Sequence, residues 1–214
     1  MLADRGFSLH HGTSLSSSVL GLRVSLEIMN IAYIGMGANL PSCAGPPEAT
    51  LAAAVLRLGS LGRVACRSSL YSTAPVGLRD QPRFVNAVVA LETELGPRTL
   101  LDALLGIEQE FGRDRSAQIA NGPRTLDLDI LLFGDLQLNE AGLEIPHPRL
   151  AQRAFALIPL NEIAPRVTYP RTGRTMTQLL HGLFPDSEGE SDAVVQIQWD
   201  GWRAGCGHAG CGAA

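Results

Sequence analysis

Alternating and helically spaced apolar residues predict a mixed α and β domain over most of the chain. Val85, Ala87, Val89 and Leu91 alternate as on one face of a strand, whereas the apolar positions around Leu100 repeat with helical spacing. The predicted strands span residues 30–36, 63–72, 84–94 and 125–133, and the predicted helices span 47–58, 97–112, 150–160 and 175–183.

The order of these elements is β-α-β-β-α-β followed by further helices. This order predicts an α+β fold, namely a ferredoxin-like antiparallel sheet with helices packed on it and additional C-terminal helices. We expect one domain over residues 29–185, preceded by a disordered or dispensable extension at 1–28. Residues 186–214 are acidic and then glycine-rich, which predicts a flexible tail.

Two aspartates interrupt the last predicted strand, whose sequence is TLDLDILLF. Because side chains alternate along a strand, Asp127 and Asp129 should share one face, with Cα atoms about 6.5–7 Å apart. Carboxylates at this spacing can hold one or two hard divalent cations. The simpler alternative is a pair of acids on a solvated strand face, and D-x-D also occurs in sugar and nucleotidyl transferases.

The amino-acid composition excludes several classes of reaction mechanism and ligand. All 17 cationic residues are arginines, so mechanisms that need a Schiff-base or Walker-type lysine are excluded. A net charge of −4 disfavours extended nucleic-acid binding, and no apolar run is long enough to cross a membrane. Anions must therefore be held by arginine, histidine, backbone N–H groups or a metal.

Several arginines and one histidine surround the predicted aspartate strand. Arg113, Arg115 and Arg124 lie in or beside a polar loop, and His147 and Arg153 follow in IPHPRLAQRAF. These cations can hold a polyphosphate and stabilise charge that develops during its transfer. A solvated basic loop and a structural histidine are the alternatives.

A long connection, residues 73–83, precedes Phe84 and Asn86. Phe84 offers a flat stacking surface, and the Asn86 amide offers both a donor and an acceptor on the same predicted strand face. This pair suits a flat heterocycle with hydrogen-bonding edges, although a core Phe with an Asn at its margin would give the same pattern.

The four cysteines suggest no disulfide framework, and a reducing cytosol is the default expectation. Cys206, His208 and Cys211 in the glycine-rich tail supply three of the four ligands usual for structural zinc. We expect no zinc site there.

Taken together, the motifs resemble those of the 6-hydroxymethyl-7,8-dihydropterin pyrophosphokinase family of folate biosynthesis. The similar segments are AYIGMGANL, YSTAPVG, DQPRFVNAV, IEQEFGRDR, GPRTLDLDILLF, IPHPRLAQRAF and PLNEIAP. The resemblance implies a ferredoxin-like enzyme that uses ATP and two Mg²⁺ ions. Such an enzyme transfers pyrophosphate to the pterin hydroxymethyl oxygen and releases AMP.

The resemblance also implies residue roles. Asp127 and Asp129 match metal ligands and, with Arg113 and Arg124, the catalytic set. The matching pterin-site positions are Thr73, Val76, Phe84, Asn86 and Phe155. The matching ATP-site positions are Glu108, Arg113, Arg115, Arg124, Ile130, His147 and Arg153.

The chain departs from the family pattern in two places. Asn121 stands where many members have a tryptophan, in a loop that is one residue longer than in a common bacterial form, and Ala74 replaces a common proline. The remaining alternatives are a D-x-D nucleotidyltransferase and a non-catalytic module that binds pterin or nucleotide. We expect a monomeric, cytoplasmic protein with small-molecule ligands only.

Overall fold

The computed structural model describes residues 29–115, 122–184 and 194–206. The predicted extension at 1–28, Asn121 in the loop, and His208 and Cys211 of the tail lie outside these ranges.

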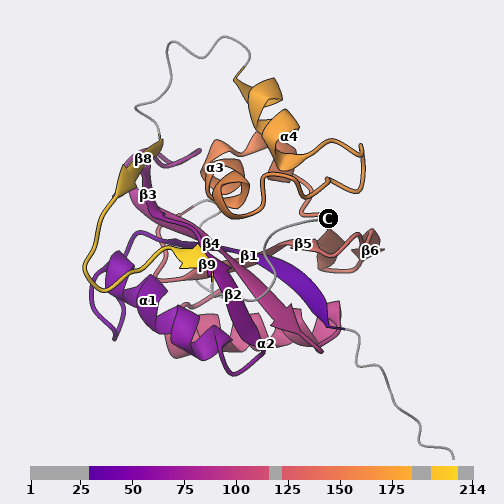
Figure 1. Ribbon diagram of the computed structural model, residues 1–214. Coiled ribbons are helices and arrows are strands. Elements are labelled where there is room, and N and C mark those ends of the chain that lie inside the picture. The colour runs from indigo at the N-terminus through magenta and orange to yellow at the C-terminus, as the bar shows by residue number, and fades with distance from the viewer. Residues whose placement is uncertain (1–28, 116–121, 185–193, 207–214) are drawn as a thin grey trace, which may run out of the picture.

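An antiparallel sheet forms the middle layer, with β1 between β4 and β5, and β2 on the other side of β4 (Figure 1). β3 also pairs with β4, further along the same strand. The bounds are β1 Asn30–Ala38, β2 Arg63–Arg67, β3 Leu70–Thr73, β4 Phe84–Thr93 and β5 Asp127–Phe133. The predicted strand at 63–72 is therefore two strands, because the Ser68 hydroxyl accepts a hydrogen bond from the Val88 backbone N–H and interrupts the ladder.

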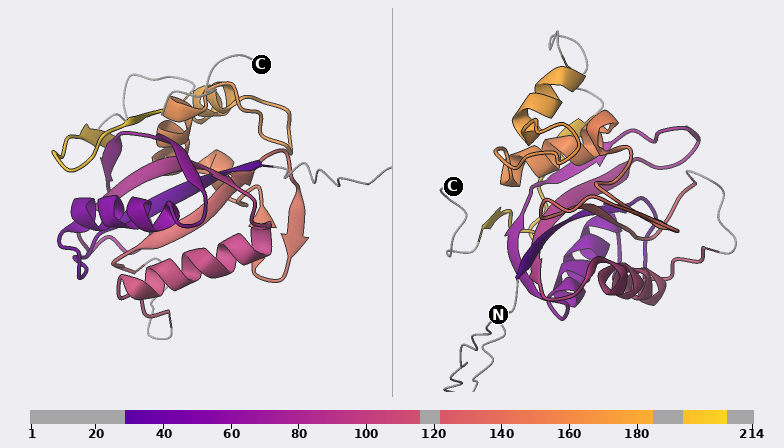
Figure 2. Two further views of the ribbon diagram at one scale, coloured as in Figure 1. Left: turned by 60° about the horizontal axis from the view of Figure 1, so that its bottom comes forward. Right: turned by 90° about the vertical axis from the view of Figure 1, so that its right-hand side faces the viewer.

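Helices cover both faces of the sheet (Figure 2). One face carries α1 (Pro47–Leu58) and α2 (Pro97–Glu110), and each of these helices begins at a proline, whose missing N–H costs nothing there. The opposite face carries α3 (Ala154–Ile163) and α4 (Met176–Leu183). The remaining elements before α3 are β6 (Leu138–Glu140), β7 (Leu143–Ile145) and the 3₁₀ turn η1 (Leu150–Gln152).

Strand alternation separates two apolar cores. Ile34 and Met36 of β1 pack beneath α1 and α2, whereas Tyr33 packs on the side of α3 and α4. The intervening Gly35 and Gly37 face this second side and leave space there. The predicted α+β antiparallel sheet with packed helices and additional C-terminal helices is confirmed at this level.

The prediction of a flexible tail is wrong for residues 194–206. β8 (Val194–Ile197) pairs with β3, and β9 (Gly205–Cys206) pairs with β2. Both strands are too short to give an alternation signal, and their partners lie more than a hundred residues earlier.

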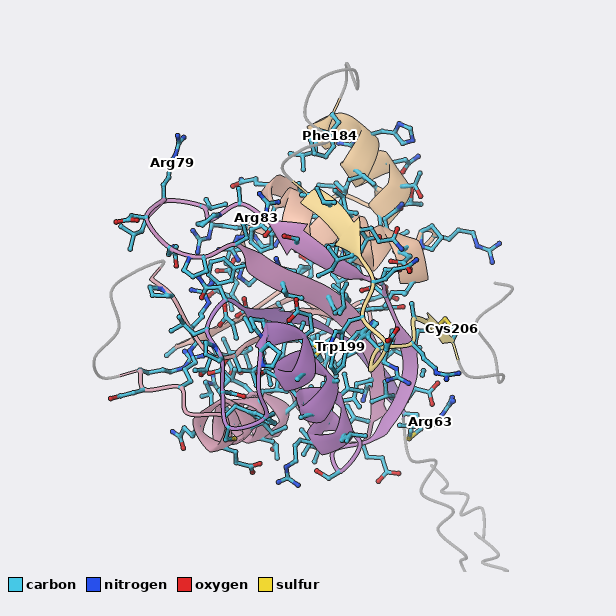
Figure 3. All side chains as sticks on the ribbon, turned by 90° about the vertical axis from the view of Figure 1, so that its left-hand side faces the viewer. Arg63, Arg79, Arg83, Phe184, Trp199 and Cys206 are labelled. Atoms are coloured by element: carbon cyan, nitrogen blue, oxygen red, sulfur yellow. A yellow bond between two sulfur atoms is a disulfide. The ribbon has the colours of Figure 1, made fainter. Side chains whose placement is uncertain are left out.

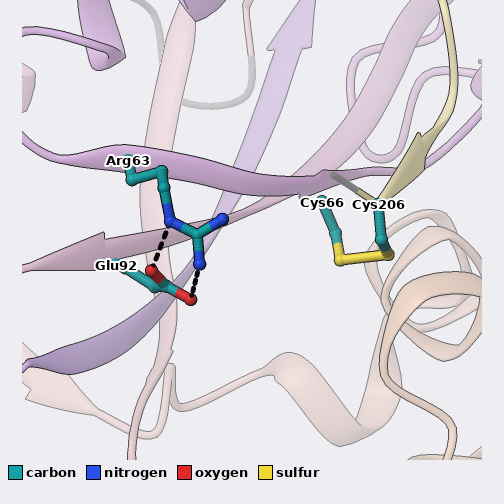
Figure 4. The surroundings of a disulfide bond; sticks show 4 residues. All are labelled: Arg63, Cys66, Glu92 and Cys206. Carbon is teal, nitrogen blue, oxygen red and sulfur yellow. Dashed lines mark hydrogen bonds and ion pairs between the residues drawn. A yellow bond between two sulfur atoms is a disulfide. The ribbon is translucent and has the colours of Figure 1, made fainter. Parts of the chain in front are cut away.

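The prediction of no disulfide is also wrong. Cys66 of β2 and Cys206 of β9 form a disulfide (Figure 4). The sheet brings these two cysteines together as register partners, which their separation of 140 residues does not reveal. Cys206 is consequently not available as a zinc ligand.

None of the helices formed by the described residues has both the length and the hydrophobicity that a membrane span requires.

Candidate active site

Asp127 and Asp129 open β5 and face the same side of the sheet, as predicted. Their register partners on β1 are Gly37 and Gly35, respectively. A Cβ atom added at Gly37 would lie 3.0 Å from the Asn86 Oδ1, and one added at Gly35 would lie 3.2 Å from the Leu131 side chain. The two glycines therefore keep a recess open beside the carboxylates.

The recess continues into a cavity of about 290 Å³ between β3, β4 and the start of α3. The predicted heterocycle residues meet in its wall although they come from separate parts of the chain. The lining residues are Thr73, Ala74, Val76, Phe84, Asn86, Arg124, Arg149, Gln152, Arg153, Ala154, Phe155 and Val194.

Two aromatic rings and an amide give this cavity its chemical character. The Arg124 guanidinium lies over the Phe84 ring at 5.0 Å, and the Arg153 guanidinium lies over the Phe155 ring at 5.4 Å. The Asn86 Nδ2 donates a hydrogen bond of 2.7 Å to the Thr73 Oγ1, which fixes the amide. The cavity thus combines flat apolar surfaces, an oriented amide and positive charge.

Glu108, at the end of α2, holds two of the predicted phosphate-binding arginines. Its side chain is 1% exposed, and its oxygens accept from the Arg113 Nη1 at 2.7 Å and from the Arg115 Nη2 at 2.6 Å. The Leu128 backbone N–H donates to the same carboxylate at 2.8 Å. The pKa of Glu108 is raised above its ordinary value, because burial outweighs the opposing effects of Arg113, the Leu128 N–H and Arg115. Glu108 is therefore placed to orient arginines.

Asp127 pairs with arginines on both sides. Arg113 donates to its Oδ1, and the Arg124 Nε lies 3.0 Å from its Oδ2. Burial, followed by the negative charge of Asp127, raises the pKa of Asp129. The charge of Asp127 is therefore balanced by two arginines, whereas the Asp129 carboxylate beside it is buried.

Arg153 lines the recess together with Asp127 and Asp129, and His147 lies beside Arg153. The His147 backbone N–H donates to the Leu131 carbonyl at 2.9 Å, and its Nε2 lies 3.5 Å from the Arg153 Nη1. Burial and then the charges of Arg153 and Arg149 lower the pKa of His147 to about 4, so the imidazole is neutral at pH 7. A neutral ring can donate one hydrogen bond to an anion.

Ile130 departs from the rest of the predicted set. Its side chain packs in the core beneath α1 and α2, on the face opposite Asp127 and Asp129. Strand alternation requires this orientation. Ile130 can contact a ligand only through its main chain on the edge strand β5.

Sequence reasoning missed Asn39, which is 3% exposed and ties the connection before β4 to Arg124 of the site. Its Nδ2 donates to the Gln81 Oε1 and to the Pro82 carbonyl, each at 3.0 Å, and its Oδ1 accepts from the Arg124 N–H at 2.8 Å. An asparagine directly after a strand in a glycine-containing turn was the available signal. Arg149, Gln152 and Val194 were missed as well.

The donor set suits a magnesium ion. Asp127 and Asp129 both line the recess, and carboxylate oxygens are the ligands that Mg²⁺ prefers. Among the residues that the structure describes, no cluster of three or more His, Cys, Asp or Glu side chains surrounds a cation position. The other ligands of such an ion would come from water and substrate phosphates, as is usual for Mg²⁺.

Comparison with known sequences gives a consistent result. Residues 33–165 match the family described as 7,8-dihydro-6-hydroxymethylpterin-pyrophosphokinase (HPPK). A Pseudomonas aeruginosa protein named 2-amino-4-hydroxy-6-hydroxymethyldihydropteridine pyrophosphokinase is 49% identical over 150 residues, which cover 69% of this chain and 88% of the relative. A Bacillus subtilis protein of the same name is 42% identical over 151 residues, covering 70% of this chain and 87% of the relative.

Solved structures share the fold. A triple mutant of Plasmodium falciparum HPPK-DHPS aligns with a TM-score of 0.60 and 16% identity, over 79% of this chain. The alignment covers 47% of that longer chain, so this protein spans about half of it.

Proposed function

Because the chain belongs to the 7,8-dihydro-6-hydroxymethylpterin-pyrophosphokinase family, we propose that it transfers pyrophosphate from ATP to 6-hydroxymethyl-7,8-dihydropterin. In this reaction the hydroxymethyl oxygen bonds to the β-phosphorus of ATP, the bond from that phosphorus to the α,β-bridging oxygen breaks, and AMP leaves. The hydroxyl proton passes to solvent. The observation that carries the proposal is the continuity of the heterocycle cavity with the recess of the aspartate pair, since both are lined by Asn86, Arg124, Arg153 and Phe155.

The cavity suits the pterin. Phe84 and Phe155 supply stacking surfaces, and Asn86 and Thr73 supply a fixed amide and a hydroxyl for the ring edge. Val76, 68% exposed at the cavity mouth, supplies an apolar rim. The hydroxymethyl group of a pterin bound there would point toward the recess of Asp127 and Asp129.

The arginines suit the triphosphate. Arg124 and Arg153 line both the cavity and the recess, so they can contact the phosphate that is attacked. Arg113 and Arg115 are oriented by Glu108, and His147 supplies a neutral donor beside Arg153. Positioned cations stabilise charge on the leaving oxygen without reorganising during the reaction.

Mg²⁺ would be held by Asp127 and Asp129, and two ions are the number that the family resemblance implies. When bound, the metal supplies neutralisation of phosphate charge. To bind the metal, Asp127 must give up its contact with Arg113 or Arg124. The released arginine could then bind the phosphates. The exchange links metal binding to nucleotide binding.

We also assign the sheet to the ferredoxin-like class. The strand order β5-β1-β4 followed by the split pair β2 and β3 supports this assignment, because every neighbouring pair is antiparallel.

The test is an assay with ATP and 6-hydroxymethyl-7,8-dihydropterin, with and without Mg²⁺, that follows AMP. We expect AMP and pterin pyrophosphate in equal amounts, only with Mg²⁺. Release of free pyrophosphate with a nucleotide-linked product would instead support the D-x-D nucleotidyltransferase. Binding of both ligands without AMP release would support the non-catalytic module. Analytical ultracentrifugation tests the expected monomer, and the expected cytoplasmic location stays a prediction.

A further inference from the structure

Residues 194–206, which we name the C-terminal arm, run along the edge of the sheet, where they pair with β2 and β3 (Figure 3). β8 adds to the edge of β3 in an antiparallel ladder from Leu70↔Ile197 to Thr73↔Val194. The arm lies beyond the family match, which ends at residue 165.

Side chains anchor the arm at three further points. The Gln196 Nε2 donates to the Ser69 Oγ at 2.9 Å. The Trp202 ring is buried, and its Nε1 donates to the Ser68 carbonyl at 2.8 Å. At the far end, Cys206 is joined to Cys66. A segment tied by a ladder, a buried indole and a disulfide is a fixed part of the fold.

The anchored arm places one residue in the heterocycle cavity. Val194 lines the cavity and is the register partner of Thr73, whose Oγ1 accepts the hydrogen bond from Asn86. Val195, the next residue, points to the other side of β8 and is 44% exposed. Strand alternation therefore gives the arm one cavity-facing valine and one exposed valine side by side.

We propose that Val194 is a specificity-determining residue for the aromatic heterocycle, and that the arm is a positioning element that fixes Thr73 and Asn86. The proposal rests on the proposed function, because it assigns the heterocycle to this cavity. Val194 would close the side of the cavity with an apolar wall, so that substituents on that edge of the ring are excluded by size.

The matched pair Val194→Trp and Val195→Trp tests this idea in full-length protein. Val194→Trp should raise the KM for the pterin by about tenfold or more, a change of about 1.4 kcal/mol, because the larger side chain would occupy cavity space that the ring needs. The KM for ATP should stay within about twofold, a change of only about 0.4 kcal/mol. Val195→Trp should leave both values near wild type.

Two outcomes would overturn the proposal: equal pterin KM values for the two variants, or parallel changes in both KM values for Val194→Trp. If wild-type protein in the same assay releases no AMP, the proposed function fails instead, so the two failures are distinguishable. Thermal unfolding of each variant checks folding. Should Val194→Trp fail to fold, Val194→Ala replaces it, with an expected rise in pterin KM of about fivefold from lost contact.

The anchoring role has its own readout. Cys206→Ser should raise the pterin KM and leave the ATP KM unchanged, and dithiothreitol should do the same to wild type. Cys43→Ser is the matched control, because Cys43 is exposed and forms no disulfide. An unchanged pterin KM in Cys206→Ser would show that the disulfide does not position the site.

Discussion

Asn86 and Asp127 lie in one row across the sheet, because both are register partners of Gly37. Adjacent strands are about 4.8 Å apart, so the Cα atoms of the two residues are about 10 Å apart. This spacing separates the amide that suits the heterocycle from the carboxylate that suits the cation. The glycine between them leaves the path open.

Gly37→Ala should damage the site without unfolding the protein. Its new Cβ would lie 3.0 Å from the Asn86 Oδ1 and would displace the amide from Thr73. Steady-state kinetics should show an increase of about tenfold in pterin KM, the cost of one misplaced hydrogen-bonding group.

Gly106→Ala is the matched control for this change. Gly106 lies within α2, and a Cβ added there meets no atom within 4 Å. It should leave the kinetics unchanged and stabilise the protein by about 0.8–1.0 kcal/mol, the helix-propensity difference. Equal pterin KM values for the two variants would contradict the role of Gly37.

Asp129→Asn should separate activity from stability. We expect a loss of about 10²–10⁴-fold in kcat with loss of the response to Mg²⁺, because a carboxylate ligand is removed. Since burial and Asp127 raise the pKa of Asp129, its charge destabilises the fold at neutral pH, and the variant should melt at the same temperature or higher. Asp135→Asn, at an exposed position just after β5, is the control. An active Asp129→Asn would remove this residue from the metal site.

Glu108→Gln tests whether the buried carboxylate orients the arginines. The amide keeps an acceptor for the Leu128 N–H but loses the charge that holds Arg113 and Arg115. We expect a higher KM for ATP, because the two arginines lose the carboxylate that orients them.

Glu110→Gln, two residues further along the chain, is the control for Glu108. The Glu110 side chain is 48% exposed and pairs with the exposed Arg57. Such surface pairs contribute little, so both the melting temperature and the ATP KM should stay near wild type. An ATP KM unchanged in Glu108→Gln would refute the orienting role.

His147 should make stability depend on pH. Its pKa is lowered to about 4 by burial and by Arg153 and Arg149. Below about pH 6.5 the unfolded chain therefore binds a proton that the folded protein does not, so stability should fall as pH drops from about 6.5 to 4. Thermal unfolding of His147→Gln over this range should show a shallower decline than wild type. Identical declines would contradict the buried, neutral state of this ring.

The local sequence predicted the elements well. The alternation around Val85 and the helical spacing around Leu100 identified β4 and α2, and their bounds differ from the predicted ones by one or two residues. The same period of two correctly placed Asp127 and Asp129 on one face. Ile130 was assigned by resemblance, and its alternation with these aspartates already indicated that its side chain points the other way.

The sequence by itself determined which side chains share a strand face and which chemistry they can perform, because side-chain direction follows from local backbone geometry. Only the tertiary structure decided which faces meet. It placed Asn86 and Asp127 on either side of Gly37. It paired Glu108 with Arg113 and Arg115. It also brought Val194 and Cys206 beside strands that occur early in the chain. These relationships depend on strand register and packing between distant segments, and no short-range pattern of residues specifies them.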